Sequence, residues 1–180
     1  MTARSVVALA PRVDTWAADE AVTRLFTAHY RPLVRLATLL LREPGVAEEI
    51  VQDAYVELHG RWRRLRDADK ALAYLRATVV NRSRSALRHR KVVDQHLART
   101  RPAPDAPSAE AGALDALEHA AVIEALRLLP TRQREALVLR YYLDLSEADI
   151  ADTMGCSRGA VKSHCSRGMA ALRQTLERVS

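Results

Sequence analysis

Aromatic residues, glycine and alternating apolar patterns are all scarce in this sequence of 180 residues. Aromatic side chains make up 4% of it, only 6 glycines occur, and no alternating apolar and polar run reaches the length of a strand. Because β-sandwiches favour aromatic and β-branched residues, a core of Leu, Ala and Val instead favours helices packed on helices. The sequence therefore predicts an all-α fold.

The chemistry of enzymes and metal sites is also missing. The two cysteines, Cys156 and Cys165, form no Cys-x-x-Cys pair, which argues against a disulfide-dense scaffold. Even with His164 between them, they lack the ligand number and spacing of a zinc site, so we interpret them as small buried residues. His29 falls on an apolar face and is interpreted as a core residue. With no nucleotide-binding glycine loop and no catalytic spacing, we expect no enzyme, no metal and no cofactor.

No apolar run approaches the ~20 residues that a membrane span needs. The short apolar stretch at residues 6–10 is broken by Pro11, so it does not resemble a signal peptide. We therefore expect a cytoplasmic protein without membrane insertion. Its formal net charge of +6 favours a polyanionic partner.

The sign of the charge changes along the chain and suggests its organisation. Between Glu43 and Leu58 there is no Lys or Arg, whereas residues 61–91 carry eleven basic and two acidic side chains, a formal charge of +9. A Pro-rich stretch then starts at residue 101, and residues 102–124 hold five acids and no base. We predict two small helical domains joined by a flexible linker, with these bounds: a flexible lead at 1–18, a first domain at 19–91, the linker at 92–112 and a second domain at 113–180.

The first domain is expected to contain three helices. Pro32 should kink or divide the first apolar run, Pro44-Gly45 should form a turn, and a loop from Arg61 to Asp69 should lead into the third helix.

The segment from Ser146 to Leu172 has the pattern of a helix-turn-helix. Ser146 and Ser157 are placed to cap two helices, and Gly155 is placed for the turn between them. Thr131 is expected to cap the preceding helix. Five polar side chains are expected to face outward from the last helix: Arg158, Lys162, Ser163, Ser166 and Arg167. They could reach phosphates and base edges of DNA. The alternative is that they form an ordinary solvated end of a helix.

A resemblance adds to this reading. Five short motifs occur in order: Leu-Pro-Thr-Arg-Gln-Arg-Glu at 129–135, Leu-Arg-Tyr at 139–141, Leu145-Ser146, Ile150-Ala151 and the stretch from Ser157 to His164. Together they resemble domain four of extracytoplasmic-function sigma factors. The resemblance implies that this helix-turn-helix reads the upstream (−35) promoter element. Three departures are His164, where Arg is usual, Ser166, which is smaller than many of its counterparts, and Gly168, which replaces a common Ala and should cost the helix about 1 kcal/mol.

The first domain resembles domain two of the same family, of an actinobacterial type. Residues 47–55 are similar to the segment that docks on core RNA polymerase, which implies Glu48, Glu49, Gln52 and Asp53 as polymerase-binding residues. The stretch Tyr74-Leu75-Arg76 to Arg84 resembles the helix that engages the −10 element, and the loop before it resembles the one that captures a flipped base. The −10 residues implied are Trp62, Arg76, Asn81, Arg82, Arg84 and Arg88. Trp62 and Tyr74 are candidates for base stacking, although such residues more often belong to the core.

The resemblance implies core RNA polymerase and promoter DNA as partners, and an anti-sigma factor as a further candidate. Two other classes remain open at this point. An autonomous helix-turn-helix repressor or activator would bind duplex DNA tightly by itself, usually as a dimer. A helical adaptor protein would leave the +9 segment and the basic helix without a partner.

Overall fold

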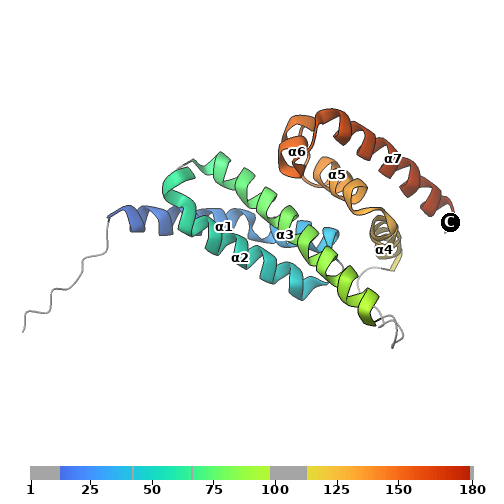
Figure 1. The fold of residues 1–180 in the computed structure, drawn as a ribbon, viewed down its shortest axis with the longest axis horizontal. Helices are drawn as coiled ribbons and strands as arrows, with labels where there is room; N and C mark the ends of the chain where they lie inside the picture. The colour runs from blue at the N-terminus through green and yellow to red at the C-terminus, as the bar shows by residue number, and fades with distance from the viewer. Residues whose placement is uncertain (1–12, 42, 66, 98–112, 179–180) are drawn as a thin grey trace, which may run out of the picture.

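The computed structural model describes residues 13–41, 43–65, 67–97 and 113–178, which form α-helices and short connections, with no strand in these ranges. Figure 1 shows the long N-terminal helices on one side and the shorter C-terminal helices on the other. This arrangement confirms the all-α prediction. The helices are α1 (Val13–Leu40), α2 (Pro44–Leu65), α3 (Ala68–Leu97), α4 (Ala113–Leu128), α5 (Thr131–Tyr141), α6 (Glu147–Met154) and α7 (Arg158–Glu177).

The first domain consists of α1, α2 and α3, which pack against one another around a core of aliphatic side chains. Each helix contributes residues at helical spacing that no solvent reaches, such as Leu36 from α1, Leu58 from α2 and Leu75 from α3. Burying such a side chain contributes roughly 1.5–3 kcal/mol, so this shared core is what holds the three helices together.

Four expectations for this part of the chain are wrong in detail. Pro32 does not divide the first apolar run, because α1 continues through it to Leu40. Since only the proline N–H is missing, one lost hydrogen bond is offset by the buried apolar side chains on either side. Helix α1 also begins at Val13, so residues 13–18 are helical rather than a flexible lead, and residues 1–12 lie outside the described part of the chain.

The turn expected at Pro44-Gly45 is also misplaced, because Pro44 is the first residue of α2. Proline suits this position, since its fixed φ is helical and its missing N–H would have no partner there. The loop expected from Arg61 to Asp69 is mostly helix, with α2 running to Leu65 and α3 starting at Ala68. Asp67 caps α3 through its carboxylate, which accepts hydrogen bonds from the backbone N–H of Asp69 and Lys70 at 2.9 and 3.3 Å.

The predicted linker is partly helical as well. Helix α3 continues to Leu97, six residues into the range assigned to the linker, and α4 begins at Ala113. The remaining linker residues, 98–112, lie outside the described residues.

The second domain consists of α4 to α7 and contains the helix-turn-helix. The Ser146 side chain caps α6 by accepting from the backbone N–H of Asp149, and Ser157 caps α7 in the same way through Ala160. Gly155 lies between them with φ of 63°, a left-handed conformation that glycine adopts at little cost. These three predictions are confirmed, but Thr131 is not a cap: α5 is preceded by Pro130 and has no side-chain cap.

The two domains touch each other. Helix α3 lies against α6, and α1 lies against α5 and α4. On the α1 side, the Tyr142 hydroxyl donates to the Pro32 carbonyl oxygen at 3.3 Å, and the Arg35 guanidinium lies 5.9 Å from the centre of the Tyr142 ring. The first domain and the helix-turn-helix are therefore placed side by side rather than apart.

Candidate polymerase and nucleic-acid interfaces

The acidic face of α2 comprises Glu48, Glu49, Gln52 and Asp53, and all four side chains are exposed. The opposite face of the same helix carries Ala47, Val51, Ala54 and Leu58, none of which is accessible to solvent. Helical periodicity separates the two sets, because residues three and four apart share a face. The four residues that the resemblance implied for polymerase binding therefore share the exposed side of α2.

Asp53 connects this acidic face to α3. Its carboxylate accepts a hydrogen bond from Arg82 of α3 at 2.8 Å, and the same guanidinium donates to Glu57 at 3.2 Å. The Tyr74 hydroxyl donates to the other oxygen of Glu57 at 2.6 Å. This hydrogen bond, followed by Arg82 and Arg61, lowers the pKa of the Glu57 carboxyl, although its partial burial opposes the shift. Glu57 thus links the two helices, a role that its place in an acidic run did not indicate.

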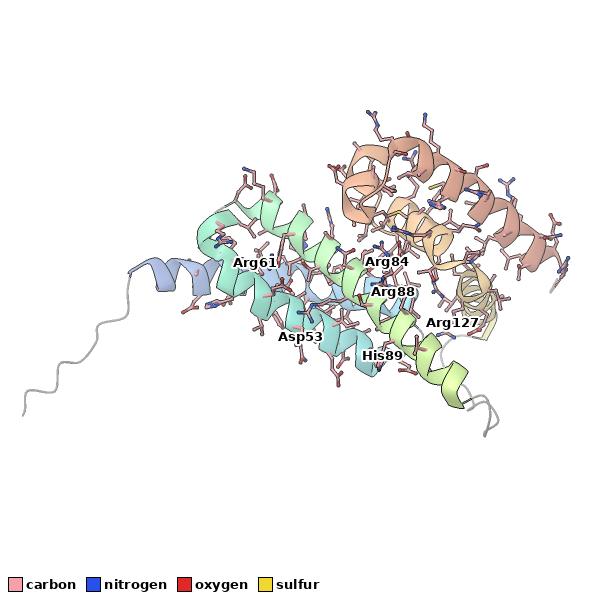
Figure 2. All side chains as sticks on the ribbon, in the orientation of Figure 1. Asp53, Arg61, Arg84, Arg88, His89 and Arg127 are labelled. Atoms are coloured by element: carbon pink, nitrogen blue, oxygen red, sulfur yellow. The ribbon has the colours of Figure 1, made fainter. Side chains whose placement is uncertain are left out.

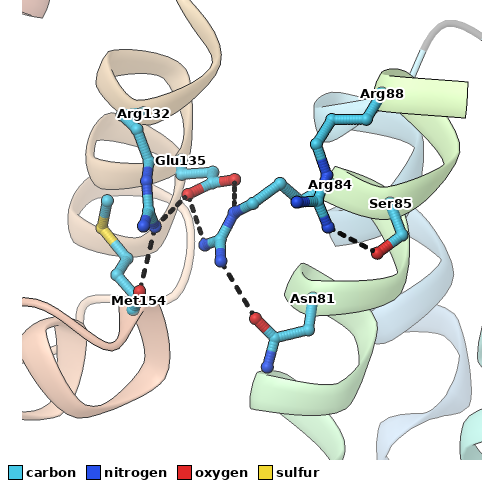
Figure 3. A network of polar contacts seen from close by, with 7 residues as sticks. All are labelled: Asn81, Arg84, Ser85, Arg88, Arg132, Glu135 and Met154. Atoms are coloured by element: carbon cyan, nitrogen blue, oxygen red, sulfur yellow. Dashed lines mark hydrogen bonds and ion pairs between the residues drawn. The ribbon is translucent and has the colours of Figure 1, made fainter.

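The six residues predicted to bind the −10 element do not form one surface. Arg82 points toward α2 and its acids, whereas Asn81 and Arg84 lie on the side of α3 that faces the second domain (Figure 3). Arg88 lies on α3 near Arg84, and its guanidinium donates to the Ser85 hydroxyl at 3.2 Å (Figures 2 and 3). Asn81, Arg84 and Arg88 lie at spacings of three and four and so share one face of α3.

The aromatic candidates are partly buried. Trp62 packs against the core of the first domain, and so does Tyr74. Burial raises the pKa of the Tyr74 hydroxyl, as does its hydrogen bond to Glu57. The packing and hydrogen bonds give both side chains a structural role in this state, and base stacking by either remains a prediction.

Arg76 lies where α3 meets α6. It lines a groove of about 280 Å³ between the domains, together with Tyr74 from its own helix and Asp149 and Asp152 from α6. Burial lowers the pKa of the Arg76 guanidinium, and the nearby Asp149 carboxylate opposes this shift. A guanidinium stays protonated at any physiological pH, so the groove holds a partly desolvated positive charge facing two acids.

The outward face of α7 carries the residues predicted for the −35 element. Arg158, Lys162, Ser166 and Arg167 are exposed and Ser163 is partly buried, while Val161 and Gly168 on the opposite side are buried. The Arg167 guanidinium donates to the Ser163 hydroxyl at 2.7 Å, and Lys162 lies 3.7 Å from a Glu147 oxygen. Figure 1 shows α7 on the side of the second domain away from α1 to α3, so the first domain leaves this face open.

His164 and Cys165 lie beside this face without forming a metal site. Burial lowers the pKa of the His164 imidazole, helped by the positive charges of Arg167 and Arg132, so the ring is neutral at pH 7. Burial raises the pKa of the Cys165 thiol. Across the described ranges, no group of three or more His, Cys, Asp or Glu side chains is arranged to hold a metal ion.

One charged cluster was not predicted from the sequence. Glu135 of α5 is 1% exposed, and its two carboxylate oxygens accept hydrogen bonds from the Arg84 Nε and Nη2 atoms at 2.9 and 2.8 Å. Arg132 donates to the same carboxylate at 3.2 Å and to the Met154 carbonyl oxygen at 2.9 Å. Figure 3 shows Arg84 reaching from α3 into the second domain between Asn81 and Glu135. Nothing in the local sequence around Glu135 indicates a partner 51 positions away.

None of the helices in the described residues has the length and apolar character that crossing a bilayer requires.

Comparison with known proteins agrees with this architecture. Residues 25–92 match the family described as Sigma-70 region 2, and residues 119–172 match Sigma-70, region 4. The RNA polymerase sigma-E factor of Streptomyces avermitilis is 34% identical over 145 residues, which cover 81% of this chain and 79% of that protein. The ECF RNA polymerase sigma factor SigM of Mycobacterium tuberculosis is 33% identical over 163 residues, covering 91% and 79%.

Among solved structures, the sigma factor RpoE in complex with the anti-sigma factor NepR from Bartonella quintana is similar, with a TM-score of 0.71 and 26% identity. The match covers 86% of this chain and 96% of that one. CnrH in complex with the cytosolic domain of CnrY shares the fold, with a TM-score of 0.64 at 24% identity.

The chain therefore belongs to the extracytoplasmic-function (ECF) family of RNA polymerase sigma factors, and its Streptomyces and Mycobacterium relatives identify it as the actinobacterial type. It is a promoter-specific transcription initiation factor whose partners are core RNA polymerase and promoter DNA.

Proposed function

We propose that three charged surfaces divide the work of this sigma factor. The acidic face of α2 binds core RNA polymerase, the face of α3 that carries Arg76, Asn81, Arg84 and Arg88 binds the −10 element, and the outward face of α7 reads the −35 element. The observation that carries this assignment is the separation of charge: exposed carboxylates gather on α2, and the basic side chains gather on α3 and α7. The proposed −10 set also includes Trp62 and Arg82. To reach DNA, Arg82 would leave its ion pairs with Asp53 and Glu57.

The acidic face suits a protein partner with a basic surface. Opposite charges steer an encounter and disfavour wrong partners, whereas DNA would be repelled by these carboxylates.

The outward face of α7 suits duplex DNA instead. Its Ser157 cap places the helix N-terminus and Arg158 at the solvent-facing end, where a phosphate gains from the helix dipole and side chains enter a major groove.

Three further points follow from the family and belong to the same proposal. Sigma factors are initiation factors, and we expect this chain to carry no catalytic activity of its own. Since its partners are the polymerase and the promoter, we expect it to act in the cytoplasm. An anti-sigma factor is also proposed as a regulator, because similar structures hold a sigma factor together with one.

The polymerase assignment is tested by reversing Glu48 and Glu49 to Lys. These two side chains are exposed, and their replacement spares the Asp53 bridge to Arg82, so the fold should persist. Like charges set against each other in an interface cost several kcal/mol, so we expect affinity for core RNA polymerase to fall roughly 100-fold. Co-purification with core enzyme and run-off transcription measure the loss.

The matched control is Glu20→Lys with Glu177→Lys, which changes the net charge equally at exposed positions on α1 and α7. This control should bind core enzyme as the unsubstituted protein does. Undiminished co-purification of the Glu48 and Glu49 variant would contradict the docking assignment.

A further inference from the structure

The side chain of Arg167 is held in place on α7 although it is exposed. Its Nη2 atom donates a hydrogen bond to the Ser163 hydroxyl at 2.7 Å, and its Nε atom donates to the Ser163 carbonyl oxygen at 3.3 Å. An exposed arginine ordinarily moves between many rotamers and loses this freedom when it binds a ligand. The hydrogen bonds to Ser163 therefore restrict the guanidinium before any partner arrives.

These contacts use one edge of the guanidinium. Because Nε and Nη2 face Ser163, the remaining N–H groups of Nη1 and Nη2 form the other edge. That edge can donate two parallel hydrogen bonds, the geometry in which arginine contacts the O6 and N7 atoms of guanine in the major groove. Since Ser163 lies one turn closer to the N-terminus of α7, the contact directs the guanidinium toward the end of the helix that would enter the groove.

The surface of α7 ahead of Arg167 leaves room for this arrangement. Gly159, Ser163 and Arg167 are spaced by four residues, so they form one row on the helix. Gly159 is exposed, and among the described atoms only Ser157 Oγ, at 3.9 Å, would lie within 4 Å of a Cβ there. Packing within the protein therefore does not require a glycine at this position. The small residues at 159 and 163 instead leave the guanidinium accessible from the N-terminal side of α7.

Lys162 on the same face is placed differently. Its ammonium lies 3.7 Å from a Glu147 oxygen in an exposed ion pair, which holds a side chain only weakly. An ammonium is also a point charge without the planar fork of a guanidinium, so it suits a phosphate better than the edge of one base. Of the two side chains, Arg167 is the one whose geometry can distinguish a base.

We propose that Ser163 is a positioning residue for promoter recognition: it holds the Arg167 guanidinium so that its outer edge contacts one guanine of the upstream element. Ser163 acts through Arg167 rather than on a base. A guanidinium free to turn would contact a phosphate as readily, so holding it increases discrimination between bases and not affinity alone. This inference rests on the proposed −35 role of the outward face of α7.

The test is Ser163→Ala, which removes the hydroxyl and keeps the helix, since alanine favours a helix. Polymerase holoenzyme is assembled with each variant, and its affinity is measured for a duplex promoter and for every single base-pair substitution in the upstream element. We expect Ser163→Ala to lower discrimination at one guanine about fivefold, and Arg167→Ala to lower it at the same guanine about tenfold or more. Ser163→Thr keeps the hydroxyl and should restore the discrimination.

The double variant separates positioning from direct contact. If Ser163 acts through Arg167, Ser163→Ala should have no further effect at that guanine once Arg167 is replaced by alanine. The matched control is Thr27→Ala, which removes an exposed hydroxyl from helix α1, where it donates to the Thr23 carbonyl oxygen at 2.9 Å. This control should change no base preference.

Three results with Ser163→Ala would overturn the positioning role: an unchanged base preference, a loss at a different base pair, or an equal loss of affinity for every sequence. A loss that adds to that of Arg167→Ala would overturn it as well. The proposed function fails in a different way, because an unchanged base preference in Arg167→Ala would reject the −35 role of Arg167 and the inference with it.

Discussion

At the residue scale, Gly168 illustrates two opposing effects. Glycine in a helix costs about 1 kcal/mol against alanine. However, a Cβ at this position would lie 3.1 Å from Leu137 Cδ1 and 3.2 Å from Gln133 Cβ, which is tighter than most Cβ contacts in proteins, so α5 would have to shift by a few tenths of an ångström. Gly168 therefore permits the close approach of α5 and α7, a reason that the sequence alone could not supply.

We expect Gly168→Ala to lower the free energy of unfolding by about 1 kcal/mol, because overpacking costs about 1–3 kcal/mol and the helix regains about 1 kcal/mol. Gly60 of α2 is the matched control, since a Cβ there meets nothing within 4 Å. Gly60→Ala should raise the free energy of unfolding by about 0.5–1 kcal/mol. Urea denaturation of both variants measures the two signs, and stabilisation by Gly168→Ala would mean that α5 yields to the methyl group.

Tyr55 makes a second residue-scale prediction. Its hydroxyl donates to the Leu25 carbonyl oxygen at 3.0 Å, and burial raises the pKa of the phenol to about 12. Since the folded pKa lies above the unfolded value of 10, the neutral phenol contributes its full stability below pH 10, and this contribution is lost as the pH rises toward 12.

The loss should amount to about 2–3 kcal/mol between pH 10 and pH 12. Tyr55→Phe removes both the titration and the hydrogen bond, so it should be less stable at pH 8 by about 1 kcal/mol and lose less stability above pH 10. Denaturant midpoints across this pH range measure the difference. Equal alkaline slopes for the two proteins would assign the loss to other groups.

At the scale of elements, α7 has an exposed basic face, which we propose reads DNA, and a buried face that packs inside the second domain. Lys162→Ala with Arg167→Ala should weaken promoter binding by the polymerase holoenzyme and reduce the salt dependence by about one unit of slope for each lost phosphate contact. Neither side chain supports the core, because both are exposed. The exposed pair with Glu147 contributes little, so the loss should come from DNA.

The control for this prediction is Arg173→Ala with Arg178→Ala, which removes the same charge from the other end of α7. We expect the control to keep a nearly unchanged salt slope. Equal slopes for the two double variants would show that α7 attracts DNA by charge alone.

The sequence predicts elements well where periodicity and capping act locally. The Ser146 and Ser157 caps and the turn at Gly155 all follow from neighbouring residues, and the structure confirms them. Pro44 was misjudged although proline suits the first position of a helix, and Pro32 was misjudged because its tolerance inside α1 depends on the surrounding packing. Local pattern carries no information on that packing.

At the scale of the whole molecule, what escaped prediction is the set of contacts between the domains. Glu135 sits in a motif whose local pattern places it simply on α5, yet it pairs with Arg84 at a separation of 51 positions. The sequence indicated the candidate residues for −10 binding as one set. The packing of α3 decides which of them face α2, as Arg82 does, and which face the second domain, as Arg84 does. A run of like charges in the sequence indicates a charged surface, but only the tertiary fold shows which other elements pack against that surface.

The turn at Gly155 has a mechanical consequence. The turn joins α6, which rests on α3, to α7, which packs along α5 and α4. A helix of 20 residues is roughly 30 Å long, so a small rotation of the second domain about the contact of α6 with α3 moves the far end of α7 through several ångströms. In this structure, the contact of α6 with α3 therefore sets the direction in which α7 points.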